Sequence, residues 1–256
     1  MKLQMNASLA YGYTSSSQKI RVITESWLSE SGYCPTCGNS LKSAKANAKV
    51  LDFECINCVH EFELKSKRVS KTMGKIADGA YSSMMERIIE PQSPHFFFLG
   101  YDTYLRVTNL MAVPNYFFQP SVIEKRNPLA DTARRAGWVG CNILLDQIPE
   151  IGKIKLVENG EIISQEKVLQ TWQKTTFLAQ QNVIESRGWT LDIIRCIERI
   201  KSKEFSLELL YKFESELAQK HPKNQFIKDK IRQQLQILRD RGYLDFVRSG
   251  HYKIID

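Results

Sequence analysis

The sequence predicts a mixed α/β (α+β) domain followed by a small winged helix-turn-helix domain. Segments with the period-two alternation of strands and segments with helical spacing are mixed through the first ~180 residues. Three helical segments and two strand-like segments then follow one another up to the C-terminus. Two identical Cys-x-x-Cys pairs in the first part indicate a metal site within the mixed domain.

The composition is that of a globular protein with a positive net charge. The chain has 256 residues, of which 43% are apolar, so it can bury a substantial core. Its net charge of +8 favours contact with a polyanion. The longest apolar runs, such as Phe96 to Leu99, are far below the roughly 20 residues of a membrane-spanning helix. No basic start followed by an apolar stretch marks a secretory signal, so we expect a cytoplasmic protein.

In the first part, apolar spacing predicts an amphipathic helix over Gln18 to Glu30. The segments on either side of CINC, from Val50 to Lys67, alternate as two strands of a hairpin. Lys71 to Ile89 is predicted as a loop that enters a helix. Further strands are expected in HFFFLGY, TYLRVTNLMAVP and KIKLVENGEII, the last with a turn at Asn159 and Gly160.

In the second part, three helices are predicted over Thr190 to Ile200, Ser206 to Gln219 and Gln225 to Arg241, with Ser206 as an N-cap. The strands YLDFV and HYKII follow, joined by a tight RSG turn. Three helices and a two-stranded wing are typical of a winged helix-turn-helix. We expect the domains to comprise residues 1–185 and 186–256.

The spacing C-x2-C-x17-C-x2-C is the most specific signal in the chain. It brings together two thiolate pairs, which complete a tetrahedral shell around Zn²⁺ and leave no open position, so the zinc is expected to be structural. The alternative is four unrelated thiols. The four predicted ligands are Cys34, Cys37, Cys55 and Cys58, whereas Cys141 and Cys196 are expected to be packing residues.

An acidic site is expected on the same hairpin. If the chain turns around Ile56 to Cys58, Asp52 lies roughly opposite Glu61 to Glu63, and alternation puts Glu63 and Lys65 on one face. Two such carboxylates would repel each other unless a cation lay between them, and Mg²⁺ prefers oxygen ligands. Lys65 can then orient an attacking water and stabilise charge on a phosphate. Charged triplets also arise by chance on solvated strand faces, and Glu25 is either a further ligand or a solvated helix carboxylate.

Two segments contain residues suited to DNA. In the third helix of the second domain, Phe226, Ile227, Ile231, Leu235 and Leu238 are expected to form an apolar stripe. The solvent-facing residues would be Asn224, Lys228, Arg232 and Gln233, types that hydrogen-bond base edges in the major groove. An ordinary charged helix face is the alternative. On the wing, Arg248 and Lys253 are candidates for phosphate contact.

The segment RNPLADTARRAGWVGCN combines Arg134, Arg135 and Trp138 in a loop or short helix. Arginines beside an exposed aromatic ring suit a nucleic-acid surface. A tryptophan more often belongs to a core, so the segment does not decide by itself.

The chain closely resembles methyl-directed type II restriction endonucleases of the DpnI type. The resemblance rests on YCPTCGN, DFECINC, HEFELKSK, DGAYSSMMERI, FFFLGY, NPLADTARRAGWVGCNI, SRGWTLDIIRCI and IKDKIRQQLQILRDRGYLDF, which occur in order through nearly the whole chain. It implies a PD-(D/E)XK nuclease fold joined to a winged helix. The implied activity is cleavage of double-stranded DNA at GATC where the adenine is N6-methylated.

The resemblance also implies roles for individual residues. The catalytic acids would be Asp52 and Glu63, binding Mg²⁺, and the catalytic lysine would be Lys65. Leu51 stands where the motif has proline, a residue that only shapes the start of the strand. Trp138 would contact the methylated base, and both domains would recognise the methylated sequence separately. We expect a monomer that acts on adenine-methylated DNA, with no membrane partner.

Two other functions fit the same features. One is a non-catalytic, zinc-containing winged-helix regulator, although Asp52 and Glu63 beside phosphates would weaken its DNA binding. The other is a repair nuclease on the same fold, which sensitivity to adenine methylation would distinguish.

Overall fold

The computed structural model describes residues 1–44, 51–69, 73–90, 93–180 and 184–255. It consists of two compact units, Met1–Thr175 and Thr176–Asp256. In this part of the chain no helix is long and apolar enough to cross a membrane. The functional boundary expected between residues 185 and 186 stays a prediction.

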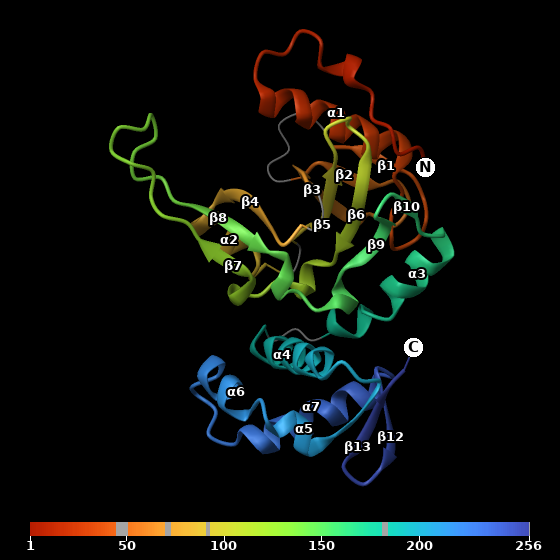
Figure 1. Ribbon diagram of the computed structural model, residues 1–256, viewed down its shortest axis with the longest axis vertical. Coiled ribbons are helices and arrows are strands. Elements are labelled where there is room, and N and C mark those ends of the chain that lie inside the picture. The colour runs from red at the N-terminus through yellow and green to blue at the C-terminus, as the bar shows by residue number, and fades with distance from the viewer. Residues whose placement is uncertain (45–50, 70–72, 91–92, 181–183, 256) are drawn as a thin grey trace. The chain divides into compact units, whose positions relative to one another are not determined.

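The first unit is built on a seven-stranded sheet of order β1-β2-β3-β5-β6-β9-β10 (Figure 1). Its strands β3 and β5 are parallel, and the other neighbours are antiparallel. The strands are β1 (Leu41–Ser43), β2 (Phe53–Cys55), β3 (Glu61–Arg68), β5 (His95–Tyr101), β6 (Val107–Val113), β9 (Ile154–Glu158) and β10 (Glu161–Ile162). The predicted hairpin and the three later strand segments are therefore confirmed.

Strand β5 is buried along almost its whole length because it lies between two long neighbours in the sheet. The turn between β9 and β10 has positive φ at both Asn159 and Gly160, as the Asn-Gly pair predicts for a tight hairpin. On one side the core packs Phe53, Phe62 and Phe97 against helix α1 (Ser16–Ser31). This helix confirms the predicted amphipathic segment and buries Trp27, whose Nε1 donates to the Lys2 carbonyl at 2.7 Å.

A second, three-stranded sheet of order β4-β8-β7 was not expected in full. Its strands are β4 (Lys75–Ala80), β8 (Gly140–Leu144) and β7 (Ile123–Lys125), all antiparallel. Strand β4 lies where a loop was predicted, and it leads into α2 (Tyr81–Arg87), which confirms the helix. Only pairing with β8, far away in sequence, makes β4 a strand. Between β7 and β8 the chain forms a projecting loop (Figure 1).

The first unit is completed by α3 (Gln165–Gln173) and five short 3-10 helices. These are η1 (Ala7–Ala10), η2 (Asn115–Phe117), η3 (Pro120–Val122), η4 (Leu145–Gln147) and η5 (Glu150–Gly152). Helix α3 begins at an N-cap, Ser164, whose side chain accepts from the N–H of Lys167. It buries Val168 and Trp172 against the same core.

The second unit has the predicted order of three helical regions and a wing. It contains η6 (Thr176–Leu178), α4 (Ile184–Ile200), β11 (Glu204–Ser206), α5 (Leu207–Tyr211), α6 (Glu214–Lys220), α7 (Ile227–Asp240), β12 (Leu244–Arg248) and β13 (His251–Ile254). The strands form a sheet of order β11-β13-β12, so the wing has a third strand that the sequence did not indicate.

Two details of this unit differ from the prediction. The second helical region is broken into α5 and α6, although Ser206 is the N-cap of α5 as expected, accepting from the N–H of Leu209. Phe226 precedes α7 and is 71% exposed, so its assignment to the apolar stripe is wrong. The stripe itself is confirmed, because Ile227, Ile231, Leu235 and Leu238 are buried.

Candidate functional site

The β2–β3 hairpin places Asp52 opposite Glu63. Asp52 directly precedes β2, and the register pairs Phe53 with Phe62, so the next position back faces Glu63. The N–H of Asp52 donates to the Phe62 carbonyl at 3.1 Å, and its Oδ2 accepts from the N–H of Leu64 at 2.8 Å. Backbone pairing and one side-chain bond thus fix a carboxylate that is still 19% exposed.

The surroundings of Asp52 favour a bound cation. Burial raises the pKa of its carboxyl group above the ordinary value, and the nearby charge of Glu25 raises it further. The hydrogen bond from Leu64 and the charges of Arg21 and Lys65 act in the opposite direction. Since burial and Glu25 outweigh them, a cation at Asp52 would relieve an unfavourable charge.

Glu63 and Lys65 share one face of β3, as alternation predicts. Lys65 Nζ lies 2.5 Å from Glu63 Oε1, and Glu63 is only 8% exposed. Burial lowers the pKa of Lys65, but the charges of Glu63 and Asp78 outweigh it and raise the pKa above the ordinary value. The ammonium group is therefore charged and held against Glu63.

Two further charged residues join this site, and the sequence reasoning missed both. Asp78 on β4 forms an ion pair with Lys65, and Arg87 at the end of α2 forms one with Glu63. Both residues lie in DGAYSSMMERI, one of the segments that carry the family resemblance, but that segment gave no role to either of them. Asp78 lies in the segment predicted as a loop, so nothing in the sequence alone directed it toward β3.

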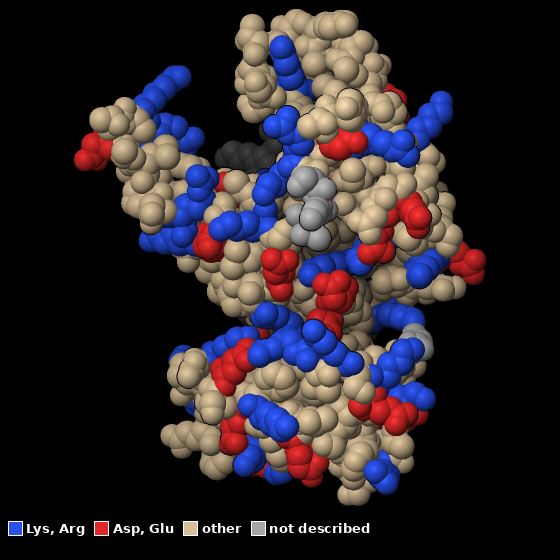
Figure 2. Space-filling view, in the orientation of Figure 1, with Lys and Arg blue, Asp and Glu red and all other residues tan. Residues whose placement is uncertain are grey.

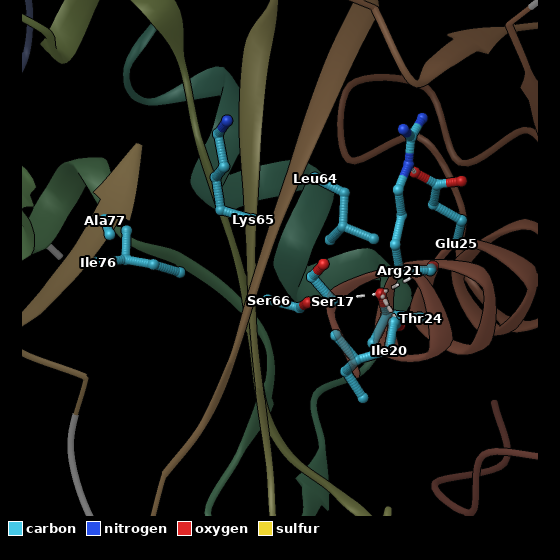
Figure 3. Close-up of a pocket in the computed structure, with 10 residues that line it drawn as sticks. All are labelled: Ser17, Ile20, Arg21, Thr24, Glu25, Leu64, Lys65, Ser66, Ile76 and Ala77. Atoms are coloured by element: carbon cyan, nitrogen blue, oxygen red, sulfur yellow. Dashed lines mark hydrogen bonds and ion pairs between the residues drawn. The ribbon is translucent and has the colours of Figure 1, made fainter. Parts of the chain in front are cut away.

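A pocket with a volume of about 160 Å³ opens beside Lys65. In Figure 3 Lys65 lies to the left of strand β3, and Leu64, Arg21 and Glu25 lie to its right, with the charged ends of Lys65 and Arg21 both extending toward the top of the view. The pocket is lined by Ser17, Ile20, Arg21, Thr24, Glu25, Leu64, Lys65, Ser66, Ile76 and Ala77. The volume is enough for several waters or a phosphate group next to the acidic site.

Glu25 is held by its own helix. Arg21 Nε lies 2.5 Å from Glu25 Oε1, while an Arg21 terminal nitrogen lies 3.9 Å from Asp52 Oδ1. The Glu25 side chain is 29% exposed. It therefore influences Asp52 by charge, and its expected role as either ligand or solvated carboxylate stays open.

The four cysteines of the two Cys-x-x-Cys pairs converge. Their sulfur atoms all lie within 4.8 Å of one another, with Cys34 3.5 Å from Cys58 and Cys37 3.4 Å from Cys55. Cys34 and Cys37 follow α1, whereas Cys55 ends β2 and Cys58 lies in the turn to β3. Four thiols in this arrangement can hold a metal ion.

The thiols differ in acidity. Burial raises the pKa of Cys34 to about 11 and also raises that of Cys58. Burial also acts on Cys37, but hydrogen bonds from Asn39 outweigh it and lower the pKa to about 6. A bound cation favours the thiolate form of all four, and this is the chemistry a tetrahedral zinc site needs. Cys141 and Cys196 are buried elsewhere, as expected of packing residues.

Trp138 lies at the end of the loop between β7 and β8. Its ring packs over Gly140, where an added Cβ would meet ring carbons at 2.7 and 2.8 Å. The Arg135 guanidinium also lies over this ring, 4.5 Å from its centroid. Arg134 and Arg135 are exposed, and Trp138 is half-buried. The loop consists of turns, which agrees with the predicted loop, and Figure 2 shows Lys and Arg side chains gathered around it.

The solvent face of α7 presents three of its four predicted contact residues. Lys228, Arg232 and Gln233 are exposed there. Arg232 donates to the Tyr211 hydroxyl at 2.9 Å, and Lys228 Nζ lies 3.4 Å from a Glu214 carboxylate oxygen. Asn224 instead precedes the helix, which begins at Ile227. Its Oδ1 accepts from the N–H of Phe226 at 2.8 Å. Its assignment to the helix face is therefore corrected.

Residues 1–181 match the sequence family described as the Dam-replacing family, and residues 185–254 match the Dam-replacing HTH domain. The chain belongs to the Dam-replacing family. Membership confirms the resemblance to DpnI-type methyl-directed restriction enzymes and supports a restriction endonuclease. The HTH match covers the second unit from α4 to β13, so it supports DNA binding there.

Within this Dam-replacing protein, the predicted residues form three groups. The acids and Lys65 meet on the β2–β3 hairpin, and the cysteines of its turn meet those that follow α1. Arg135 and Trp138 contact each other on the β7–β8 loop. Strand β3 is the shared element of the first two groups, because it begins directly after the Cys58 turn and contains Glu63 and Lys65.

Proposed function

We propose that the chain is a type II restriction endonuclease that hydrolyses phosphodiester bonds of duplex DNA at GATC sites containing N6-methyladenine, with Mg²⁺ as its catalytic metal. Residues 1–185 would be the PD-(D/E)XK nuclease domain with its zinc site, and residues 186–256 the winged-helix domain. The observation that supports catalysis is the meeting of Asp52, Glu63 and Lys65 on one hairpin, beside an open pocket.

The donor set fits a hard divalent cation. Asp52 uses Oδ2 for the Leu64 N–H, and within the described part of the chain the charged partner of Oδ1 is Arg21, at 3.9 Å. Glu63 supplies a second carboxylate from β3, and the bond from the Asp52 N–H to the Phe62 carbonyl limits the motion of Asp52 relative to it. Oxygen ligands with room for water and a phosphate oxygen are what Mg²⁺ prefers. Asp52 and Glu63 would hold the ion, which lowers the pKa of bound water and neutralises charge on the phosphate.

Lys65 has the position of a group that acts on the reacting phosphate. Its ammonium is charged, and the residue, whose side chain is 19% exposed, borders the pocket. A fixed positive charge stabilises the additional negative charge that develops on a phosphate under attack. The same ammonium donates hydrogen bonds, so it can also orient the attacking water.

The cysteine site would hold a structural Zn²⁺. With four protein ligands the ion has no free position for water or substrate, and its contribution would be to the folding of the hairpin. Because Cys55 and Cys58 lie between Asp52 and Glu63 along the chain, the zinc would fix the turn that brings the two acids together.

Recognition of the methylated site would involve both units. Adenine N6 lies in the major groove, where an added methyl group offers an apolar contact to an aromatic face such as Trp138. Arg134 and Arg135 beside it would contact phosphates or bases. In the second unit Lys228, Arg232 and Gln233 on α7 would contact bases, with Asn224 at the start of the helix and Arg248 and Lys253 on the wing as further contacts.

The test uses matched plasmids, one adenine-methylated at GATC and one unmethylated, incubated with the purified protein and Mg²⁺. Cleavage of the methylated plasmid alone, abolished by EDTA and by Asp52→Ala, is the expected result. Cutting of both plasmids would keep the nuclease and remove the methyl dependence. Binding without any cutting would point to a DNA-binding regulator instead.

A further inference from the structure

Asp78 is a buried carboxylate for which the proposed reaction has so far no role. Its side chain is 4% exposed, and it forms an ion pair with the Lys65 ammonium. Strand β4 fixes its backbone by pairing Asp78 with Cys141 of β8. A buried carboxylate is costly unless it is paired, so this contact is the main compensation for the charge of Asp78.

Four charges of alternating sign follow one another at the site. Asp78 contacts Lys65, Lys65 contacts Glu63 and Glu63 contacts Arg87. Lys65 therefore has two acidic partners that differ in kind. Glu63 belongs to the acidic pair that would bind the metal, whereas Asp78 comes from another sheet and has no contact with Asp52 or Glu63 among the described interactions.

A divalent cation bound at Glu63 would act on the Lys65 ammonium through its charge. An ion bound to Glu63 takes over part of that carboxylate and repels the ammonium at close range. Lys65 then needs a second anion to stay beside the reacting phosphate. Asp78 is the carboxylate in contact with it that the cation does not use.

We propose that Asp78 is a positioning residue that holds Lys65 in place when Glu63 turns to the metal ion. The inference rests on the proposed function, because it takes Asp52 and Glu63 as metal ligands and Lys65 as the group acting on the phosphate. Through Asp78, Lys65 also contacts the β4-β8-β7 sheet, which contains Gly140 next to Trp138. The same sheet pairs Ala80 with Gly140, and the N–H of Tyr81 donates to the Val139 carbonyl at 3.1 Å.

The first test is Asp78→Asn in the full-length protein, assayed on a duplex with a methylated GATC site. The substitution keeps the shape and removes the charge. We expect kcat to fall about 10- to 100-fold because Lys65 is misplaced, with KM changed less than about twofold because Asp78 does not reach the DNA. Asp78→Glu keeps the charge but adds a methylene, so it should retain more activity than Asp78→Asn. A purely structural residue would show the opposite order, because the longer side chain overpacks the site.

The matched control is Glu124→Gln. Glu124 is a carboxylate of the same sheet that pairs with Lys75 and makes no recorded contact with Lys65, Glu63 or Asp52. Its neutralisation should leave kcat within about twofold of the parent, as expected for an exposed ion pair. An equal loss in both variants would show that net charge, not the Lys65 contact, is responsible.

The second test does not depend on cleavage. Binding of Mn²⁺ alone is measured by calorimetry in the parent, Asp78→Asn, Lys65→Met and the double variant. Without the Asp78 charge, Lys65 pairs with Glu63 alone and competes more strongly with the ion for that carboxylate. Asp78→Asn should therefore weaken Mn²⁺ binding about tenfold when Lys65 is present, but only about two- to threefold in the Lys65→Met background. The same factor in both backgrounds would overturn the inference, because the charge of Asp78 would then affect the bound ion directly and not through Lys65.

The two proposals fail separately. If the parent cuts methylated DNA and Asp78→Asn cuts equally fast, only the role of Asp78 is refuted. If the parent does not cut at all, the proposed nuclease is refuted, and the Mn²⁺ cycle still decides whether Asp78 acts through Lys65.

Discussion

Gly140→Ala should weaken the response to adenine methylation without unfolding the protein. The added carbon would lie 2.7 and 2.8 Å from two carbons of the Trp138 ring. Ordinary carbon–carbon contacts are ~3.5 Å or longer, so the ring must move by about 0.7 Å or more. Trp138 is half-buried and can move toward solvent, which limits the loss of stability.

The size of the effect follows from the contact that is lost. Burying one methyl group contributes about 0.8 kcal/mol, which is roughly a fourfold change in an equilibrium or rate ratio. We therefore expect the ratio of kcat/KM on methylated to unmethylated GATC duplexes to fall at least about fourfold in Gly140→Ala. Trp138→Ala should lower it as much, and Gly140→Ala should then add nothing.

Gly79→Ala is the matched control. Gly79 lies on the neighbouring strand β4, and an added Cβ there meets no atom within 4 Å. This variant should keep the parental ratio. A parental ratio in Gly140→Ala, or an equal loss in Gly79→Ala, would refute the argument that the Trp138 ring contacts the methyl group.

Three further predictions concern catalysis, the zinc site and acid stability. Lys65→Ala should keep DNA affinity but lose about 10²- to 10³-fold in cleavage rate, as for other groups that stabilise transition-state charge; near-parental cleavage would exclude that role. Cys34→Ala should bind no zinc by metal analysis and should melt at lower temperature, and a stable, fully active, zinc-free variant would contradict a structural site. Burial lowers the pKa of His95 to about 3 from 6.5, so its contribution to stability is complete above pH 6.5 and is lost as pH falls toward 3. At pH 5 this loss is about 2 kcal/mol, and His95→Phe should lose correspondingly less between pH 7 and pH 5 in denaturant titrations.

The local physics of the chain explains which predictions were confirmed. Helix α1 and the hairpin of β2 and β3 have clear apolar periods, and the Asn-Gly turn between β9 and β10 has a specific backbone requirement. The spacing of the two Cys-x-x-Cys pairs likewise predicted that their four sulfur atoms lie together. For the same reason the pairing of Asp52 with Glu63 and of Glu63 with Lys65 followed from short-range alternation along a hairpin.

What depends on contacts between distant segments could not be predicted. Strand β4 forms because β8 pairs with it, and this pairing delivers Asp78 to Lys65. Arg87 reaches Glu63 because α2 follows β4, and its position at a helix end gives no sequence signal. Similarly, β11 is a strand only because β13 lies beside it.

By itself, then, the sequence predicted the main helices, the hairpins, the cysteine cluster and the acid-acid-lysine group, because each depends on residues close together along the chain. Only the tertiary structure decided which charges join the proposed active site and how the Trp138 loop connects to it. The reason is that Asp78, Arg87 and Gly140 belong to segments whose conformation and neighbours are set by long-range strand pairing and burial, which no local pattern encodes.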